Sequence, residues 1–134
     1  MAMIPVVSLE HVGIVARSGE TPLSAAFGDG PLHGTPMPSG VTVAHFGPHD
    51  VLELIWPHRP GSPVEKYLAT RGPGLHHLAL RVEVCLDELV DKLREAGFRT
   101  TGEIQGAADG RPSVFLHPSS TGGVLLELVQ GERR

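Results

Sequence analysis

Four residues of this chain have the types and the spacing of a metal site. His11 lies in one short apolar run, and Glu53 lies in another, 42 residues further on (53 − 11). The arrangement recurs with His77 and Glu127, which are 50 residues apart (127 − 77). Imidazole and carboxylate together suit Zn, Mn, Fe, Co or Ni better than Ca, which prefers an all-oxygen shell. An internal repeat with one histidine and one glutamate in each copy predicts a site for one divalent cation.

The surroundings of the two glutamates support this interpretation. Glu53 interrupts the apolar run Val51–Ile55, and Glu127 interrupts Leu125–Val129. Burying a carboxylate costs several kcal/mol unless it is paired or binds a metal. Side chains alternate along a strand, so a histidine on the first strand of a copy and a glutamate on the last can face the same side. Any one of these residues alone is more often structural, but the match in both copies favours ligation.

The elements that would position these residues follow a βαβββ pattern in each copy, although the strand after the first helix is hard to see in the first copy. Strands are predicted at residues 8–16, 41–46 and 51–56 in the first copy, and from Leu75 and near 98–104, 113–117 and 124–129 in the second. Helices are predicted at 21–27, from Ser62, and at 86–97, and the Gly- and Pro-rich segment 28–40 is predicted to be a loop. We therefore expect a single α+β domain over residues 1–134, with module one at about 8–60 and module two at about 74–131.

The composition argues against several classes of partner. The net charge of −4 disfavours nucleic acid and anionic membranes. No apolar run approaches the roughly twenty residues that a membrane-spanning helix needs, and the first residues lack the features of a signal peptide, so we expect a cytoplasmic protein. Cys85 is the only cysteine, which excludes an intramolecular disulfide, and we expect it to pack as an apolar residue.

At these motifs the chain resembles the vicinal oxygen chelate (glyoxalase/bleomycin resistance/dioxygenase) superfamily, and within it the methylmalonyl-CoA epimerase branch. In the second half the resemblance rests on Gly74-Leu-His-His-Leu-Ala-Leu80, Leu93-Arg-Glu-Ala-Gly97 and the run Val114–Val129. In the first half it rests on Glu10-His-Val-Gly-Ile14 and Leu52-Glu-Leu54, and only segment 17–40 is not covered. The resemblance implies two βαβββ modules that form an open eight-stranded sheet around a metal, with module one shortened, and a homodimer.

The resemblance also implies a site and a chemistry. The metal ligands become His11, Glu53, His77 and Glu127, and His77 is chosen over His76 because it aligns with His11. A divalent metal that chelates a thioester oxygen and the neighbouring carboxylate stabilises the enolate formed when the C2 proton leaves, and an acid/base pair inverts C2. The substrate is then a small molecule, with a CoA thioester as one candidate.

One departure from the family pattern bears on catalysis. These epimerases carry a glutamate-containing segment before the strand that corresponds to Val41–Phe46, whereas Gly34–Gly40 contains no carboxylate. Glu127, His33 or His45 would have to replace it, and we take Glu127 as the catalytic candidate. The alternatives are a glyoxalase-type isomerase, another tailoring enzyme on the same metal scaffold such as an iron-dependent oxygenase, and a metal-free protein that sequesters a ligand.

Overall fold

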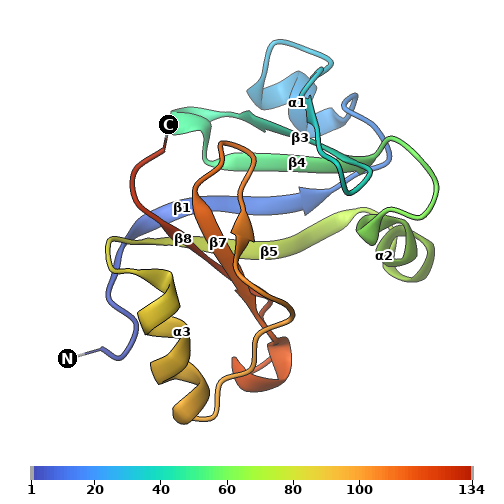
Figure 1. Ribbon diagram of the computed structural model, residues 1–134. Helices are drawn as coiled ribbons and strands as arrows, with labels where there is room; N and C mark the ends of the chain where they lie inside the picture. Colours follow the sequence, from blue (N-terminus) through green and yellow to red (C-terminus); the bar gives the residue numbers. More distant parts are fainter. Residues whose placement is uncertain (1, 134) are drawn as a thin grey trace. The chain divides into compact units, whose positions relative to one another are not determined.

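The computed structural model describes residues 2–133 (Figure 1). Its strands are β1 Val6–Val15, β2 Thr35–Pro36, β3 Val41–Phe46, β4 Leu52–Pro57, β5 Gly74–Val82, β6 Gln105–Gly106, β7 Pro112–Leu116 and β8 Leu126–Gln130. Its helices are α1 Pro22–Phe27, α2 Pro63–Arg71 and α3 Leu86–Glu95, with 3₁₀ turns η1 Pro48–Asp50 and η2 Pro118–Ser120. The strands form an eight-stranded sheet in the order β2-β3-β4-β1-β5-β8-β7-β6, which confirms the predicted α+β class.

The chain divides into two compact units. The first unit contains residues 11–76, and the second contains residues 1–10 and 77–134. In the first unit β4 pairs parallel with β1 and antiparallel with β3, and in the second β8 pairs parallel with β5 and antiparallel with β7. The registers also match, because Gly13 lies opposite Glu53 and Ala79 lies opposite Glu127. In both units the histidine thus stands two residues before the register partner of its glutamate.

The core of the second unit lies between α3 and one face of its strands (Figure 1). The buried side chains of α3 repeat at helical spacing, at Leu86, Leu89, Val90 and Leu93, as the sequence predicts. They pack against alternate residues of β5, β7 and β8, which are Val82, Val114, Leu116 and Leu128. Since side chains alternate along a strand, His77 and Glu127 belong to the opposite face of the same strands.

The first unit has a shorter helix in the equivalent place. Thr21 caps α1, because its hydroxyl accepts a hydrogen bond from the Ser24 N–H and the Ser24 hydroxyl accepts one from the Thr21 N–H. The helix nevertheless spans 6 residues, compared with 10 in α3.

One core cluster of this unit joins Phe46 and Leu54 to loop residue Leu32, and another packs α2 on β1, β3 and β4. Module one is therefore shortened, as predicted.

Three local predictions are wrong. Residues 98–104 form only an isolated bridge from Thr100 to Leu116, because Gly102 and the bends around it end the pairing. The predicted loop at 28–40 contains the two-residue strand β2, which pairs with β3. Cys85 is exposed at the N-cap of α3 instead of packing inside.

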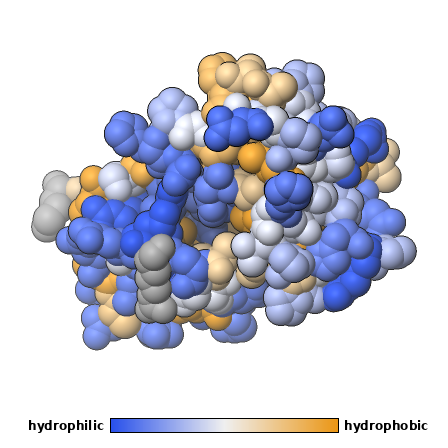
Figure 2. All heavy atoms as spheres, turned by 90° about the horizontal axis from the view of Figure 1, so that it is seen from above, coloured by the Kyte–Doolittle hydropathy of each residue, from blue (hydrophilic) through white to orange (hydrophobic). Residues whose placement is uncertain are grey.

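Polar residues dominate the face drawn in Figure 2, and apolar residues form small separate patches on it. Leu75 and Phe27 are the most exposed large apolar side chains among the described residues, at 72% and 57%. Within residues 2–133, none of the helices has the length and apolar character required to cross a bilayer.

Candidate metal centre

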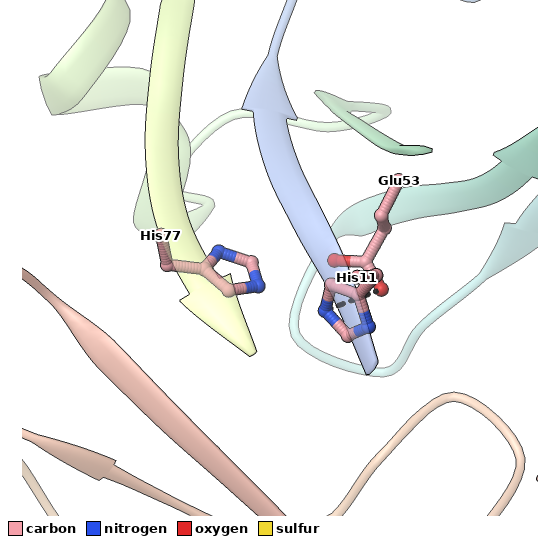
Figure 3. Close-up of side chains that lie close together, drawn as sticks. All are labelled: His11, Glu53 and His77. Atoms are coloured by element: carbon pink, nitrogen blue, oxygen red, sulfur yellow. Dashed lines mark ion pairs between the residues drawn. The ribbon is translucent and has the colours of Figure 1, made fainter. Parts of the chain in front are cut away.

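In the first unit the predicted ligands His11 and Glu53 form a buried pair. His11 comes from β1 and Glu53 from the neighbouring parallel strand β4, and they are 4% and 7% exposed. The Nε2 atom of His11 lies 3.2 Å from Oε2 of Glu53 (Figure 3, dashed line). The register explains the contact, because both side chains leave the same face of the parallel pair.

The second unit repeats this geometry. His77 on β5 and Glu127 on β8 are both 6% exposed, and Nε2 of His77 lies 3.3 Å from Oε1 of Glu127. The ring of Phe115, on the antiparallel neighbour β7, packs edge-on against His77 with centroids 5.2 Å apart. Each half of the chain thus presents one imidazole and one carboxylate from a parallel pair of strands.

Within each pair, the distance between the imidazole nitrogen and the carboxylate oxygen fits two ligands of a small divalent cation. With metal–ligand bonds of about 2.1 Å, neighbouring ligands lie about 3.0 Å apart in an octahedron and about 3.4 Å apart in a tetrahedron. The observed separations of 3.2 Å and 3.3 Å fall between these values. A charge-assisted hydrogen bond is shorter, at about 2.7–2.9 Å. The donor set of imidazole nitrogen and carboxylate oxygen excludes Ca as the preferred ion and fits the first-row metals and Zn.

Three of the predicted ligands, His11 and Glu53 of the first unit and His77 of the second, are buried residues of types that bind metal ions. Figure 3 draws their side chains on β1, β4 and β5. Glu127, the fourth predicted ligand and the catalytic candidate, lies beside His77 within the second unit. His76, the neighbour that we did not choose as a ligand, packs its ring edge-on against that of Tyr67, with ring centroids 5.1 Å apart.

A further imidazole lies beside the first pair. His45 on β3 is the direct cross-strand partner of Glu53, and its Nε2 lies 2.9 Å from the same oxygen, Oε2. Its ring also contacts that of His11, with centroids 5.4 Å apart. His33, the other histidine considered for proton transfer, is exposed in the loop after α1. Side chains alternate along β3, and a short turn connects this strand to β4. These features predict a contact between His45 and Glu53 only once the strand register is known.

The first unit also contains a cavity of about 500 Å³, between the end of α1 and the end of β3. His45 and Phe46 line it on the strand side, and Phe27 and Leu32 line it on the other. Asp29 and Asp50 make its rim acidic. The volume lies in the range of small-molecule pockets.

A buried ion pair that the sequence did not reveal lies in the second unit. The guanidinium of Arg111 contacts Glu10 and donates through Nε to Asp109 at 2.8 Å and through Nη1 to the Gly131 carbonyl at 2.9 Å. Burial by itself lowers the pKa of Arg111. The hydrogen bonds to Glu10 and Asp109 and the negative charges of both carboxylates together raise it by more, so the pKa of Arg111 lies above its ordinary value. Arg111, which directly precedes β7, therefore stays charged and connects the middle of β1, at Glu10, to Gly131 after β8.

Comparisons with known proteins agree with this fold and site. The chain is 40% identical over 95 residues to an ethylmalonyl-CoA/methylmalonyl-CoA epimerase of Cereibacter sphaeroides, a match that covers 68% of this chain and 70% of the relative. It superposes on the crystal structure of methylmalonyl-CoA epimerase from Mycobacterium tuberculosis with a TM-score of 0.77 at 28% identity, over 99% of this chain and 93% of the other.

A second solved structure carries a ligand. It is a Streptomyces coelicolor methylmalonyl-CoA epimerase in complex with 2-nitronate-propionyl-CoA, with a TM-score of 0.78 at 27% identity, over 96% of this chain and 99% of the other. Residues 10–115 match the family description Glyoxalase/Bleomycin resistance protein/Dioxygenase superfamily. The chain, with its duplicated strands and paired histidines and glutamates, belongs to this superfamily.

Proposed function

We propose that this protein is a metal-dependent epimerase that inverts C2 of a 2-methylmalonyl-type acyl thioester. The observation that carries the proposal is the pair of buried His–Glu contacts, at 3.2 Å and 3.3 Å, in a chain 40% identical to an epimerase of malonyl-type CoA thioesters. The complex of a similar enzyme with 2-nitronate-propionyl-CoA supports a CoA thioester as the substrate class.

In this proposal His11, Glu53, His77 and Glu127 hold one divalent cation. When bound, the cation supplies positive charge that stabilises the enolate formed from the thioester. The two neutral imidazoles and two carboxylates balance a dication, which offsets the cost of burying both glutamates. The side chains of both pairs are buried, which limits the access of water and strengthens the electrostatic interactions inside the site.

The proton at C2 needs an acceptor among the residues of this chain. We propose that Glu127 takes this role in addition to ligation, because segment 34–40 contains no carboxylate and His33 is exposed. Removing the proton requires one basic group, whereas inversion requires that a proton returns on the opposite face. Exchange of the C2 proton and inversion are therefore separate observables of the same site.

The test combines metal content with proton exchange. Protein purified without chelator is analysed for bound metal and then incubated with 2-methylmalonyl-CoA in D₂O, with C2 deuteration and inversion followed by mass spectrometry and chiral analysis. We expect about one equivalent of a divalent metal, and deuteration that chelator abolishes and added metal restores. Metal-replete protein that never deuterates this substrate but converts a hemithioacetal would contradict the proposal in favour of a glyoxalase-type isomerase. Protein that binds no metal but retains a ligand would favour sequestration.

A further inference from the structure

The two halves of the duplicated site differ at one register position. In the first unit the cross-strand partner of Glu53 is His45, and in the second the cross-strand partner of Glu127 is Phe115. Both partners stand on the strand antiparallel to the glutamate, and both rings pack edge-on against the histidine of their own half. The aromatic contact is therefore common to the two halves, whereas a polar ring atom at this position occurs in the first half.

His45 makes a hydrogen bond to Glu53 through its ring nitrogen Nε2. Its Nε2 lies 2.9 Å from Oε2 of Glu53, which is a hydrogen-bond distance, while the Nε2 of His11 lies at 3.2 Å from the same oxygen. Since Glu53 is an acceptor when ionised, His45 donates from Nε2. This donation sets the tautomer of His45 and restricts the rotation of the Glu53 carboxylate.

Packing does not explain an imidazole at this position. The side chain of His45 is 28% exposed and lines the cavity between α1 and β3, so the ring is not enclosed by the core. An apolar ring fills the matching position in the second unit and keeps the contact with the histidine. The Nε2–Glu53 hydrogen bond is therefore the feature that distinguishes His45 from Phe115.

We propose that His45 is a positioning residue, which holds Glu53 in the orientation that a cation requires. The inference rests on the proposed metal site. Groups that hydrogen-bond to metal ligands and orient them typically contribute 10- to 100-fold to metal affinity. In this arrangement His45 orients the carboxylate of Glu53 before the metal binds, and His45 does not itself bind the metal.

The experiment measures Zn²⁺ affinity by competition with a chromophoric chelator. We expect His45→Phe, which copies the second unit, to weaken Zn²⁺ binding by about 10- to 100-fold. His45→Gln retains an N–H donor and should lie between this variant and the wild type. The matched control is His58→Phe, which removes an imidazole that contacts the Thr42 hydroxyl at 3.1 Å in the same unit. This control should bind Zn²⁺ like the wild type.

A second measurement separates a positioning role from ligation. Pulsed electron paramagnetic resonance of the Cu²⁺-loaded protein counts coordinated imidazoles, and we expect two in the wild type and two in His45→Phe. Three coordinated imidazoles in the wild type and two in His45→Phe would overturn the positioning role, because His45 would then be a ligand. Equal Zn²⁺ affinity of His45→Phe and the wild type would overturn this inference and leave the metal site intact. A wild-type protein that binds no metal would overturn both proposals.

Discussion

Replacing Glu127 by Gln separates the stability of the metal-free protein from its response to metal. Glu127 is 6% exposed and its partner is His77, with Nε2 of the imidazole 3.3 Å from Oε1 of the carboxylate. The amide of Gln has nearly the same shape and can still hydrogen-bond to the imidazole. Gln carries no charge, so the cost of desolvating a buried carboxylate disappears in the variant. The metal-free variant should therefore melt at the wild-type temperature or above it.

The metal-loaded proteins should differ in the opposite sense. At a metal concentration of 100 times Kd, binding stabilises the wild type by about 2.7 kcal/mol. If the loss of one charged ligand weakens binding about 100-fold, the variant at this concentration gains about 0.4 kcal/mol. For a chain of 134 residues, 1 kcal/mol corresponds to about 3–4 °C in Tm. We expect a rise of about 10 °C for the wild type and about 1–2 °C for Glu127→Gln.

Differential scanning fluorimetry with and without Zn²⁺ or Co²⁺ measures both quantities on the same samples. The control is Glu88→Gln, which makes the same chemical change at an exposed position on α3 and should keep the full rise. An equal metal-induced rise in Glu127→Gln and the wild type would refute the assignment of Glu127 as a ligand. A lower Tm of the metal-free variant would show instead that the carboxylate stabilises the fold.

Three further predictions concern the scaffold, each measured by urea unfolding. Arg111→Met removes the buried guanidinium from Glu10, which keeps the more exposed guanidinium of Arg133 at 3.4 Å, and should lower the free energy of unfolding by up to about 3–5 kcal/mol. A loss below about 1 kcal/mol would contradict a stabilising ion pair between Arg111 and Glu10. Leu93→Ala opens a cavity under α3 and should cost about 2–5 kcal/mol, whereas a cost near zero would mean that the helix does not pack there. Gly34→Ala should lower the free energy of unfolding more than Gly122→Ala. Both glycines have positive φ, at +67° and +75°, but the added methyl group meets a backbone oxygen at 2.7 Å at Gly34 and open space at Gly122. Equal losses of stability would count against crowding at Gly34.

Local and periodic features explain why much of the fold could be predicted. The helical spacing of Leu86, Leu89, Val90 and Leu93 describes the buried face of α3, and Thr21 followed by proline marks the start of α1. Both signals act within one or two turns of chain. A strand near residues 98–104 was predicted from the local sequence, but pairing with a neighbour decides whether a strand forms, and there the pairing is limited to one bridge.

The duplicated pattern of His11, Glu53, His77 and Glu127 can be recognised from the sequence, because a repeated unit carries the same residue types at matching positions. The folded chain was needed to find that His45 lies opposite Glu53 and that Arg111 contacts Glu10, 101 residues away in the chain. Contacts between distant segments depend on strand register and packing, which local sequence patterns do not specify. A charge or an imidazole has no preferred partner until the backbone places one within hydrogen-bond distance.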